Sequence, residues 1–249
     1  MPFVTHRGQR IHYAMRGSGE TVVLLHGLFG AAKRWEESGW VSALARDFRV
    51  VCIDSLGHGE SDKPGDPAHY VRASRAGDVI AVLDAIGEDR AHVLGYSMGG
   101  WIATAVALHH PERLALLALG GWDPLGGVQG ATNDGVGFDR VLAALRARLP
   151  DLAASIAPEA EPALRSCWGA LFENDGAVDA LVRLRCPVLM WSGDGDACHD
   201  RVKALAGDRG FPFLSTRGDH ASAVVLGRDR VVARLVGLFR TAEPRPRSR

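Results

Sequence analysis

A serine enclosed by glycines ends one of the apolar segments of this 249-residue chain. In "GYSMGG", Ser97 occupies the pattern G-x-S-x-G, with the strand-like segment "HVL" before it and a helical stretch from Trp101 after it. At a sharp turn from strand to helix, side chains at Gly95 and Gly99 would collide with the backbone, and the serine hydroxyl is pushed out above the strands. The pattern therefore predicts an exposed, nucleophilic serine.

The same six residues have a second interpretation. An ordinary glycine-rich turn with a capping serine is common in proteins that alternate strands and helices. A serine hydroxyl attacks a carbonyl at neutral pH only when a base and an orienting carboxylate activate it. The nucleophilic interpretation of Ser97 therefore requires a histidine and an acid elsewhere in the chain.

His220 is the best candidate for the base among the 10 histidines. The stretch "RGDHAS" places it in a glycine-containing loop after the apolar segment "FPFLS". From such a loop an imidazole can reach across the top of a sheet, which makes general-base catalysis possible. The alternative is a histidine that occupies a surface loop without a chemical role.

Three aspartates compete for the role of orienting acid. The stretch "MWSGDGDACHD" ends an apolar segment and offers Asp194 and Asp196, of which we predict Asp196, with Asp194 as the nearest competitor. Asp123 in "GGWDP" ends the preceding apolar segment and is the third candidate. The ends of neighbouring strands lie at the same corner of a sheet, so the sequence register alone leaves Asp123 open.

These side chains need a framework, and the apolar patterning predicts an α/β fold. Two short β-type segments cover about residues 3–5 and 9–14. Continuous apolar runs, typical of strands buried on both faces, follow at "TVVLLHG", "RVVCIDS", "AHVLGYS", "RLALLALGG" and "CPVLMWSGD". Between them, residues 70–86 and 101–108 have helical spacing. Alternating strands and helices predict a mostly parallel central sheet flanked by helices.

One interval interrupts the alternation. Residues 122–183 begin with glycine-rich sequence and continue with Phe138 and later apolar residues at amphipathic helical spacing. We interpret this interval as a helical lid inserted after the sixth strand, so that residues 1–121 and 184–240 form the core. Residues 241–249 are rich in proline and arginine, and we expect a disordered tail.

Composition excludes several classes of function. Lys plus Arg and Asp plus Glu each total 29, so the formal net charge is zero and no broad field attracts nucleic acid or an anionic membrane. Neither a signal peptide nor a membrane-spanning segment is predicted, and we expect a cytoplasmic protein that is a monomer or a homodimer. The four cysteines have no CxxC spacing, which favours structural roles over metal or redox chemistry.

Taken in order, "VVLLHGLFG", "DSLGHGESDKP", "GYSMGG", "GDGD" and "GDH" resemble the motifs of the α/β-hydrolase fold superfamily. The resemblance is to its lid-bearing esterases, lactonases and carbon-carbon bond hydrolases, and the order serine, aspartate, histidine is that of the fold. It implies that the backbone N–H groups of Leu28 and Met98 stabilise an oxyanion. His26 is expected to brace this loop. Structural roles are implied for three further residues, Asp54, His58 and Ser61.

The expected activity is a serine hydrolase that cleaves a small to medium, largely apolar ester through an acyl-enzyme, with no metal or organic cofactor. Candidate substrate-binding residues are the large apolar side chains Phe29, Trp35, Trp122, Phe138, Trp168 and Phe172. The same groups also suit a lactonase or a carbon-carbon bond hydrolase acting on a β-diketone or a meta-cleavage product. A non-hydrolytic receptor or a lyase on the same fold is the alternative of another class.

Overall fold

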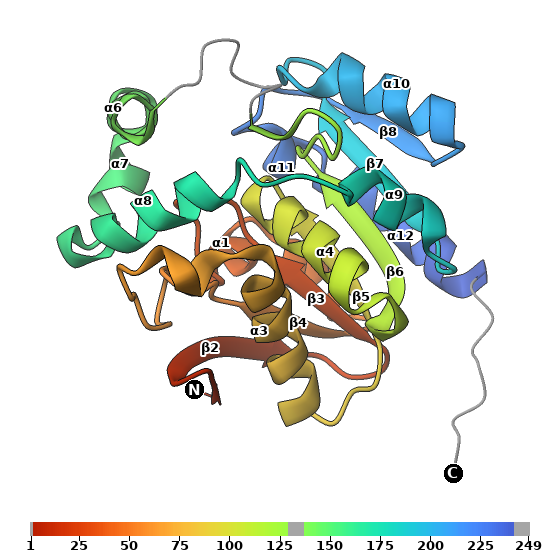
Figure 1. Cartoon of the computed structure of the whole chain (residues 1–249). Coiled ribbons are helices and arrows are strands. Elements are labelled where there is room, and N and C mark those ends of the chain that lie inside the picture. The colour runs from red at the N-terminus through yellow and green to blue at the C-terminus, as the bar shows by residue number, and fades with distance from the viewer. Residues whose placement is uncertain (1, 129–136, 242–249) are drawn as a thin grey trace.

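A computed structural model describes residues 2–128 and 137–241 of the chain (Figure 1). Eight strands form one sheet in the order β1-β2-β4-β3-β5-β6-β7-β8. β2 pairs antiparallel with β1 and with β4, and all other pairs are parallel. The strands are β1 (Phe3–His6), β2 (Gln9–Arg16), β3 (Thr21–Leu25), β4 (Arg49–Ile53), β5 (Ala91–Tyr96), β6 (Leu114–Gly120), β7 (Val188–Gly193) and β8 (Phe213–Thr216). The mostly parallel sheet confirms the predicted fold class.

Helices cover both faces of the sheet because the central strands are apolar on both faces. On one face Val23 and Leu25 of β3 belong to a cluster with α3 (Arg72–Ala85), α4 (Met98–His109) and α10 (His199–Arg209). On the other face Val22 and Leu24 pack with α1 (Lys33–Glu37), α2 (Trp40–Leu44) and α12 (Arg228–Thr241). Alternate residues of one strand thus build two separate cores.

The segment between β6 and β7 contributes α6 (Phe138–Arg148), α7 (Pro150–Ala154), α8 (Glu161–Ala170) and α9 (Ala177–Arg183). In Figure 1 these helices run from α6 and α7 at the left to α9, which lies beside α4. Part of the glycine-rich start of the predicted insertion, residues 129–136, lies outside the described residues. The predicted disordered tail also lies outside them from residue 242 onward, so the domain boundaries stay a prediction.

Short helices complete the connections: η1 (Pro67–Tyr70), η2 (Pro111–Arg113), η3 (Pro158–Ala160) and α11 (Ala223–Leu226). Across residues 2–128 and 137–241, the helices are too short or too polar for any of them to span a lipid bilayer.

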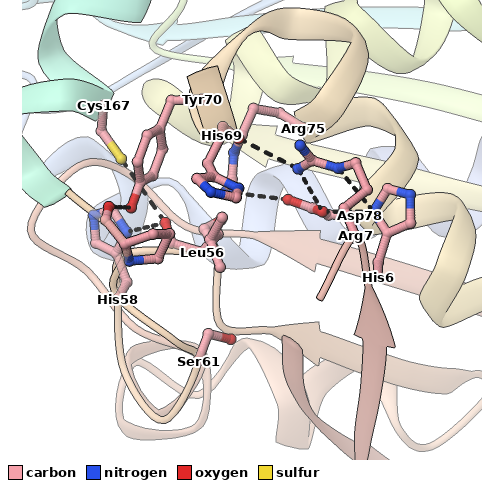
Figure 2. A network of polar contacts seen from close by, with 12 residues as sticks. His6, Arg7, Leu56, His58, Ser61, His69, Tyr70, Arg75, Asp78 and Cys167 are labelled. Atoms are coloured by element: carbon pink, nitrogen blue, oxygen red, sulfur yellow. Dashed lines mark hydrogen bonds and ion pairs between the residues drawn. The ribbon is translucent and has the colours of Figure 1, made fainter. Parts of the chain in front are cut away.

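A buried ion network fastens the antiparallel edge of the sheet to α3 (Figure 2). The Asp78 carboxylate is 2.7 Å from Arg75 Nη1 on the same helix, and both side chains are buried. It is also 2.8 Å from His6 Nδ1 and 3.3 Å from Arg7 Nη2 at the β1–β2 hairpin. A buried charge is tolerated only when it is paired, so this network makes the position of the hairpin dependent on Asp78.

We expect Asp78→Asn to lower the free energy of unfolding by about 3 kcal/mol, because it leaves the buried Arg75 guanidinium without its counter-charge. Asp84→Asn on the same helix is the control, since the Asp84 carboxylate is 63% exposed in its ion pair with Arg113. An exposed pair contributes at most about 1 kcal/mol. Urea denaturation of both variants measures the difference, and equal losses would contradict the role given to the buried network.

Candidate active site

Ser97 lies at the turn between β5 and α4, where the sequence places the G-x-S-x-G pattern. Its backbone has φ 55° and ψ −119°, a conformation that L residues rarely adopt. The Ser97 N–H donates to the Gly120 carbonyl of β6 at 2.8 Å, and the Trp101 N–H donates to the Ser97 carbonyl at 3.1 Å. The strained residue is therefore held from both sides, by the neighbouring strand and by the first turn of the helix.

The flanking glycines are required by close backbone contacts. A Cβ atom at Gly95 would lie 2.0 Å from the Gly99 carbonyl oxygen, and one at Gly99 would lie 2.0 Å from the Leu25 carbonyl oxygen. Both distances are far below van der Waals contact, and the atoms met are backbone atoms that cannot move aside. The turn at Ser97 therefore exists only because β5, α4 and the end of β3 approach one another without side chains between them.

The three predicted side chains are joined by hydrogen bonds. Ser97 Oγ is 2.9 Å from His220 Nε2, and His220 Nδ1 is 2.8 Å from Asp196 Oδ2. Asp196 follows β7 and His220 follows β8, so the side chains come from the carboxyl ends of three strands of one sheet. In this arrangement Nδ1–H donates to the carboxylate, which leaves the Nε2 lone pair directed at the hydroxyl.

Asp196 is charged in this setting. Its side chain is 3% exposed, and burial by itself would raise the pKa of the carboxyl group. The hydrogen bond and the charge of His220, together with the Cys198 N–H, outweigh burial and hold the pKa below its ordinary value. A carboxylate that stays ionised near neutral pH can fix the tautomer of the imidazole and stabilise it when it is protonated.

The other two candidate acids have different partners. Asp123 Oδ1 accepts the N–H groups of Leu125 and Gly126, and its Oδ2 lies 2.8 Å from Arg201 Nε. Asp194 Oδ1 accepts the N–H of Gly218 at 3.0 Å, which ties the loop after β7 to the loop that carries His220. The structure thus brings Asp196 to His220, and Asp123 and Asp194 hold loops.

The two predicted oxyanion donors flank the serine. A Cβ atom at Gly27 would lie 3.8 Å from Ser97 Oγ, so the loop that contains Leu28 passes directly beside the hydroxyl. Met98 begins α4, and the first N–H groups of a helix have no acceptor within it. In the described part of the chain, neither the Leu28 nor the Met98 N–H donates to another group. Both donors are available to an anion.

His26 braces this loop, as expected from the sequence. Its Nε2 accepts the Ser55 N–H at 3.1 Å, so the proton is on Nδ1, which donates to the Gly27 carbonyl at 2.8 Å. Burial lowers the pKa of His26, which keeps the ring neutral. The expected structural residues lie close by, since Asp54 accepts the N–H of Ala32 at 2.6 Å and Ser61 Oγ donates to the Asp54 carbonyl at 2.6 Å.

Five of the six predicted pocket aromatics belong to the cluster on the α3 and α4 face. Phe29 and Phe138 have ring centroids 6.2 Å apart, which joins the loop after Leu28 to α6. Trp122 is buried beside Gly100, where a Cβ atom would lie 2.6 Å from the tryptophan Cβ. Trp168 and the further candidate Phe172 lie edge to face at 5.8 Å. Their role as substrate contacts stays a prediction.

The structure contradicts the predicted substrate-binding role of Trp35. It is 3% exposed and packs edge to face against Trp40 at 5.4 Å, in the core on the opposite face of the sheet. Trp35 lies in the short helix α1, which can pack on either face of the sheet, and the sequence contains no signal that decides between them. Trp35 is a core residue and does not line a pocket at Ser97.

A cavity of about 620 Å³ lies beside the loop that follows β3. Phe29 and Gly30 line it on this side, and Ile156 and Leu164 line it on the side of the inserted helices. None of Ser97, Asp196 or His220 is among its lining residues. The size of this cavity alone does not make it the substrate site.

One neighbour of the serine was missed by the sequence analysis. Tyr96 precedes Ser97 in the motif, and its hydroxyl donates to the His220 carbonyl at 2.6 Å. The contact joins residues 124 positions apart, and no local pattern indicates it. Among residues 2–128 and 137–241, no group of three or more His, Cys, Asp or Glu side chains has the arrangement of a metal site.

We expect Gly99→Ala to lower the free energy of unfolding by about 3 kcal/mol, because the added methyl group meets backbone that cannot repack. Gly207→Ala in α10 is the control: the position is exposed, and a Cβ atom there has no neighbour within 4 Å. Alanine is the better helix former by about 0.5–1 kcal/mol, so this variant gains stability. Thermal and urea denaturation measure the change in the free energy of unfolding of each variant. A Gly99→Ala variant as stable as wild type would disprove the close approach of α4 to β3.

Comparisons with known proteins agree with this architecture. Residues 20–125 match the model of the alpha/beta hydrolase fold family. An enol-lactonase from Burkholderia xenovorans LB400 superposes with a TM-score of 0.77 over 96% of this chain and 100% of its own, at 24% identity. At this identity the superposition shows the fold alone.

Two curated relatives match in sequence over part of the chain. A Bacillus subtilis (strain 168) protein, provisionally named 2-succinyl-6-hydroxy-2,4-cyclohexadiene-1-carboxylate synthase, is 32% identical over 137 residues, which are 53% of this chain and 49% of the relative. A provisionally named carbamate hydrolase of Caulobacter sp. (strain K31) is 37% identical over 113 residues, 45% of this chain and 41% of the relative. The matches span half or less of the length of these relatives. The sheet order, the turn at Ser97 and the family-model match over residues 20–125 together show that the chain has the α/β-hydrolase fold.

Proposed function

We propose that the protein is a serine hydrolase that cleaves a small to medium, largely apolar ester through an acyl-enzyme. The observation that carries the proposal is the continuous hydrogen-bonded series from Ser97 Oγ through His220 to Asp196. Each link has the length of a hydrogen bond before any substrate is present, and the carboxylate is buried and ionised. A serine that only caps a turn needs neither partner.

The chemistry follows from these contacts. His220 Nε2 takes the Ser97 proton as Oγ attacks the carbonyl carbon, and Asp196 stabilises the imidazolium through Nδ1–H. The N–H groups of Leu28 and Met98 donate to the oxyanion, and the amino end of α4 adds a favourable field for negative charge. Collapse expels the alcohol, which receives the proton from His220. Water then attacks the acyl-enzyme with His220 again as base, and Ser97 is released.

The composition of the surrounding aromatic residues favours an apolar substrate. Phe29, Phe138 and Trp168 belong to the hydrophobic cluster on the α4 face of the sheet, and they offer apolar contact area on the face where α4 begins. A lactone is an internal ester and passes through the same steps, and an enol-lactonase shares the fold, so lactone hydrolysis is the second candidate. The relative provisionally named a synthase keeps non-hydrolytic chemistry as the alternative of another class.

We expect wild-type protein to react with a fluorophosphonate at Ser97 and to hydrolyse p-nitrophenyl esters, fastest with short to medium acyl chains. Ser97→Ala removes the nucleophile and lowers ester turnover by about 10⁴-fold or more, with a melting temperature close to wild type. Mass spectrometry of the labelled peptide identifies the site. Labelling of Ser97 with slow ester turnover would favour lactone hydrolysis, which is tested with lactones of five- and six-membered rings. Absence of reaction with the fluorophosphonate, the esters and the lactones would refute the proposed hydrolase activity.

Two aspartate variants test which carboxylate serves His220. Asp196→Asn cannot accept Nδ1–H as a carboxylate does, and we expect kcat to fall by about 10⁴-fold. Asp123→Asn weakens the pairing with Arg201 and lowers stability, while kcat stays within about 10-fold of wild type. Steady-state kinetics on one p-nitrophenyl ester compares them. A larger loss of kcat at position 123 would transfer the role to Asp123.

A further inference from the structure

The loop that contains His220 is exposed to solvent on its outer side, where no other element of the described chain packs against it. The His220 side chain is 52% exposed, and its neighbours Arg217, Asp219 and Ala221 are exposed as well. The position of the imidazole is therefore set by contacts from the protein side of the loop. Asp196 holds the ring through Nδ1, and Asp194 holds the loop at the Gly218 N–H, but neither of these bonds reaches the backbone of His220.

Tyr96 supplies a second contact, to the backbone of the same residue. Its hydroxyl donates to the His220 carbonyl at 2.6 Å, and the two rings lie 5.5 Å apart with a 37° tilt. Tyr96 is also covalently joined to Ser97 at the end of β5. One rigid residue thus connects the turn that carries the serine with the loop that carries the histidine.

Tyr96 is itself fixed in place by its surroundings. Its ring lies 5.1 Å from Trp191, which in turn lies 6.0 Å from Trp40. Gly121, at φ 55°, leaves room for the tyrosine, because a Cβ atom there would lie 2.8 Å from Tyr96 Cζ. We call the stacked rings of Trp40, Trp191 and Tyr96 the aromatic column. Burial raises the pKa of Tyr96 well above its ordinary value, so the hydroxyl keeps its proton and remains a donor.

The aromatic column holds the histidine loop at two places. Tyr96 binds the His220 carbonyl, and at the other end Trp40 Nε1 donates to the Val224 carbonyl at 2.7 Å. Val224 lies in α11, four residues after His220. Both donors are buried side chains with planar, few-rotamer geometry, so they lose little freedom when they fix the loop.

We propose that Tyr96 is a positioning residue for the general base: its hydroxyl fixes the His220 backbone so that Nε2 faces Ser97 Oγ. The inference rests on the proposed function, because it concerns the geometry of the same proton transfer. Tyr96 therefore acts through the histidine. Since proton transfer depends steeply on alignment, loss of the contact affects the rate more than substrate binding.

The test compares Tyr96→Phe with Tyr70→Phe. Tyr70 is also buried, and its hydroxyl donates to the Pro64 carbonyl at 2.7 Å, in the region of η1 shown in Figure 2. Each variant removes one buried hydroxyl that binds a backbone carbonyl, so the two losses of stability should be similar. Only Tyr96→Phe is expected to lower kcat for a p-nitrophenyl ester, by about 10-fold or more, with KM within about 2-fold. The rate of fluorophosphonate labelling at Ser97 should fall in parallel.

A Tyr96→Phe variant with wild-type kcat overturns the proposal. Equal losses of kcat in both variants also overturn it, because they would indicate a general effect of stability. Hydrogen exchange of residues 217–226 gives a readout that does not need activity, and we expect it to accelerate in Tyr96→Phe alone, by about 5-fold or more. Unchanged exchange there also overturns the proposal. If wild-type protein neither labels nor turns over esters, the proposed function fails, and the exchange measurement still decides whether Tyr96 holds the loop.

Discussion

The strained backbone at Ser97 is the constraint on which the rest of the site depends. A residue at φ 55° and ψ −119° is maintained only where its surroundings leave no alternative, and here the Gly120 carbonyl and the first turn of α4 fix it on both sides. The contacts at Gly95 and Gly99 bring the backbones of β3, β5 and α4 together without side chains between them. This close approach also places Ser97 beside the loop that carries Leu28.

The parallel sheet explains why residues distant in sequence meet at this turn. β5, β7 and β8 end at the same edge of the sheet, so the residues that follow them lie within reach of one another. Ser97, Asp196 and His220 each follow one of these strands. The two buried carboxylates near the site each have their own hydrogen-bond donor. His220 pairs with Asp196, and Arg201 pairs with Asp123.

The two faces of the sheet contain different groups of aromatic residues. The face with α3 and α4 contains Phe29, Phe138 and the other aromatics that are the proposed substrate contacts. The opposite face contains the aromatic column, which supports the histidine loop from below. Trp35 extends this column through its contact with Trp40, which gives a physical reason for its burial. Support and proposed recognition are thus separated by the sheet itself.

The sequence by itself determined the fold class and pointed to Ser97 and His220 as the central pair. Apolar runs without alternation require strands buried on both faces, and glycines around a serine at the end of such a run require a tight turn; both are local properties of the chain. What only the tertiary structure decided are contacts between segments far apart. The choice of Asp196 over Asp123 and Asp194 depends on which loop reaches His220, and the face on which Trp35 packs depends on where α1 lies against the sheet. The hydrogen bond from Tyr96 to His220 crosses 124 positions and depends on the register of β5 against the loop after β8, which no local pattern encodes.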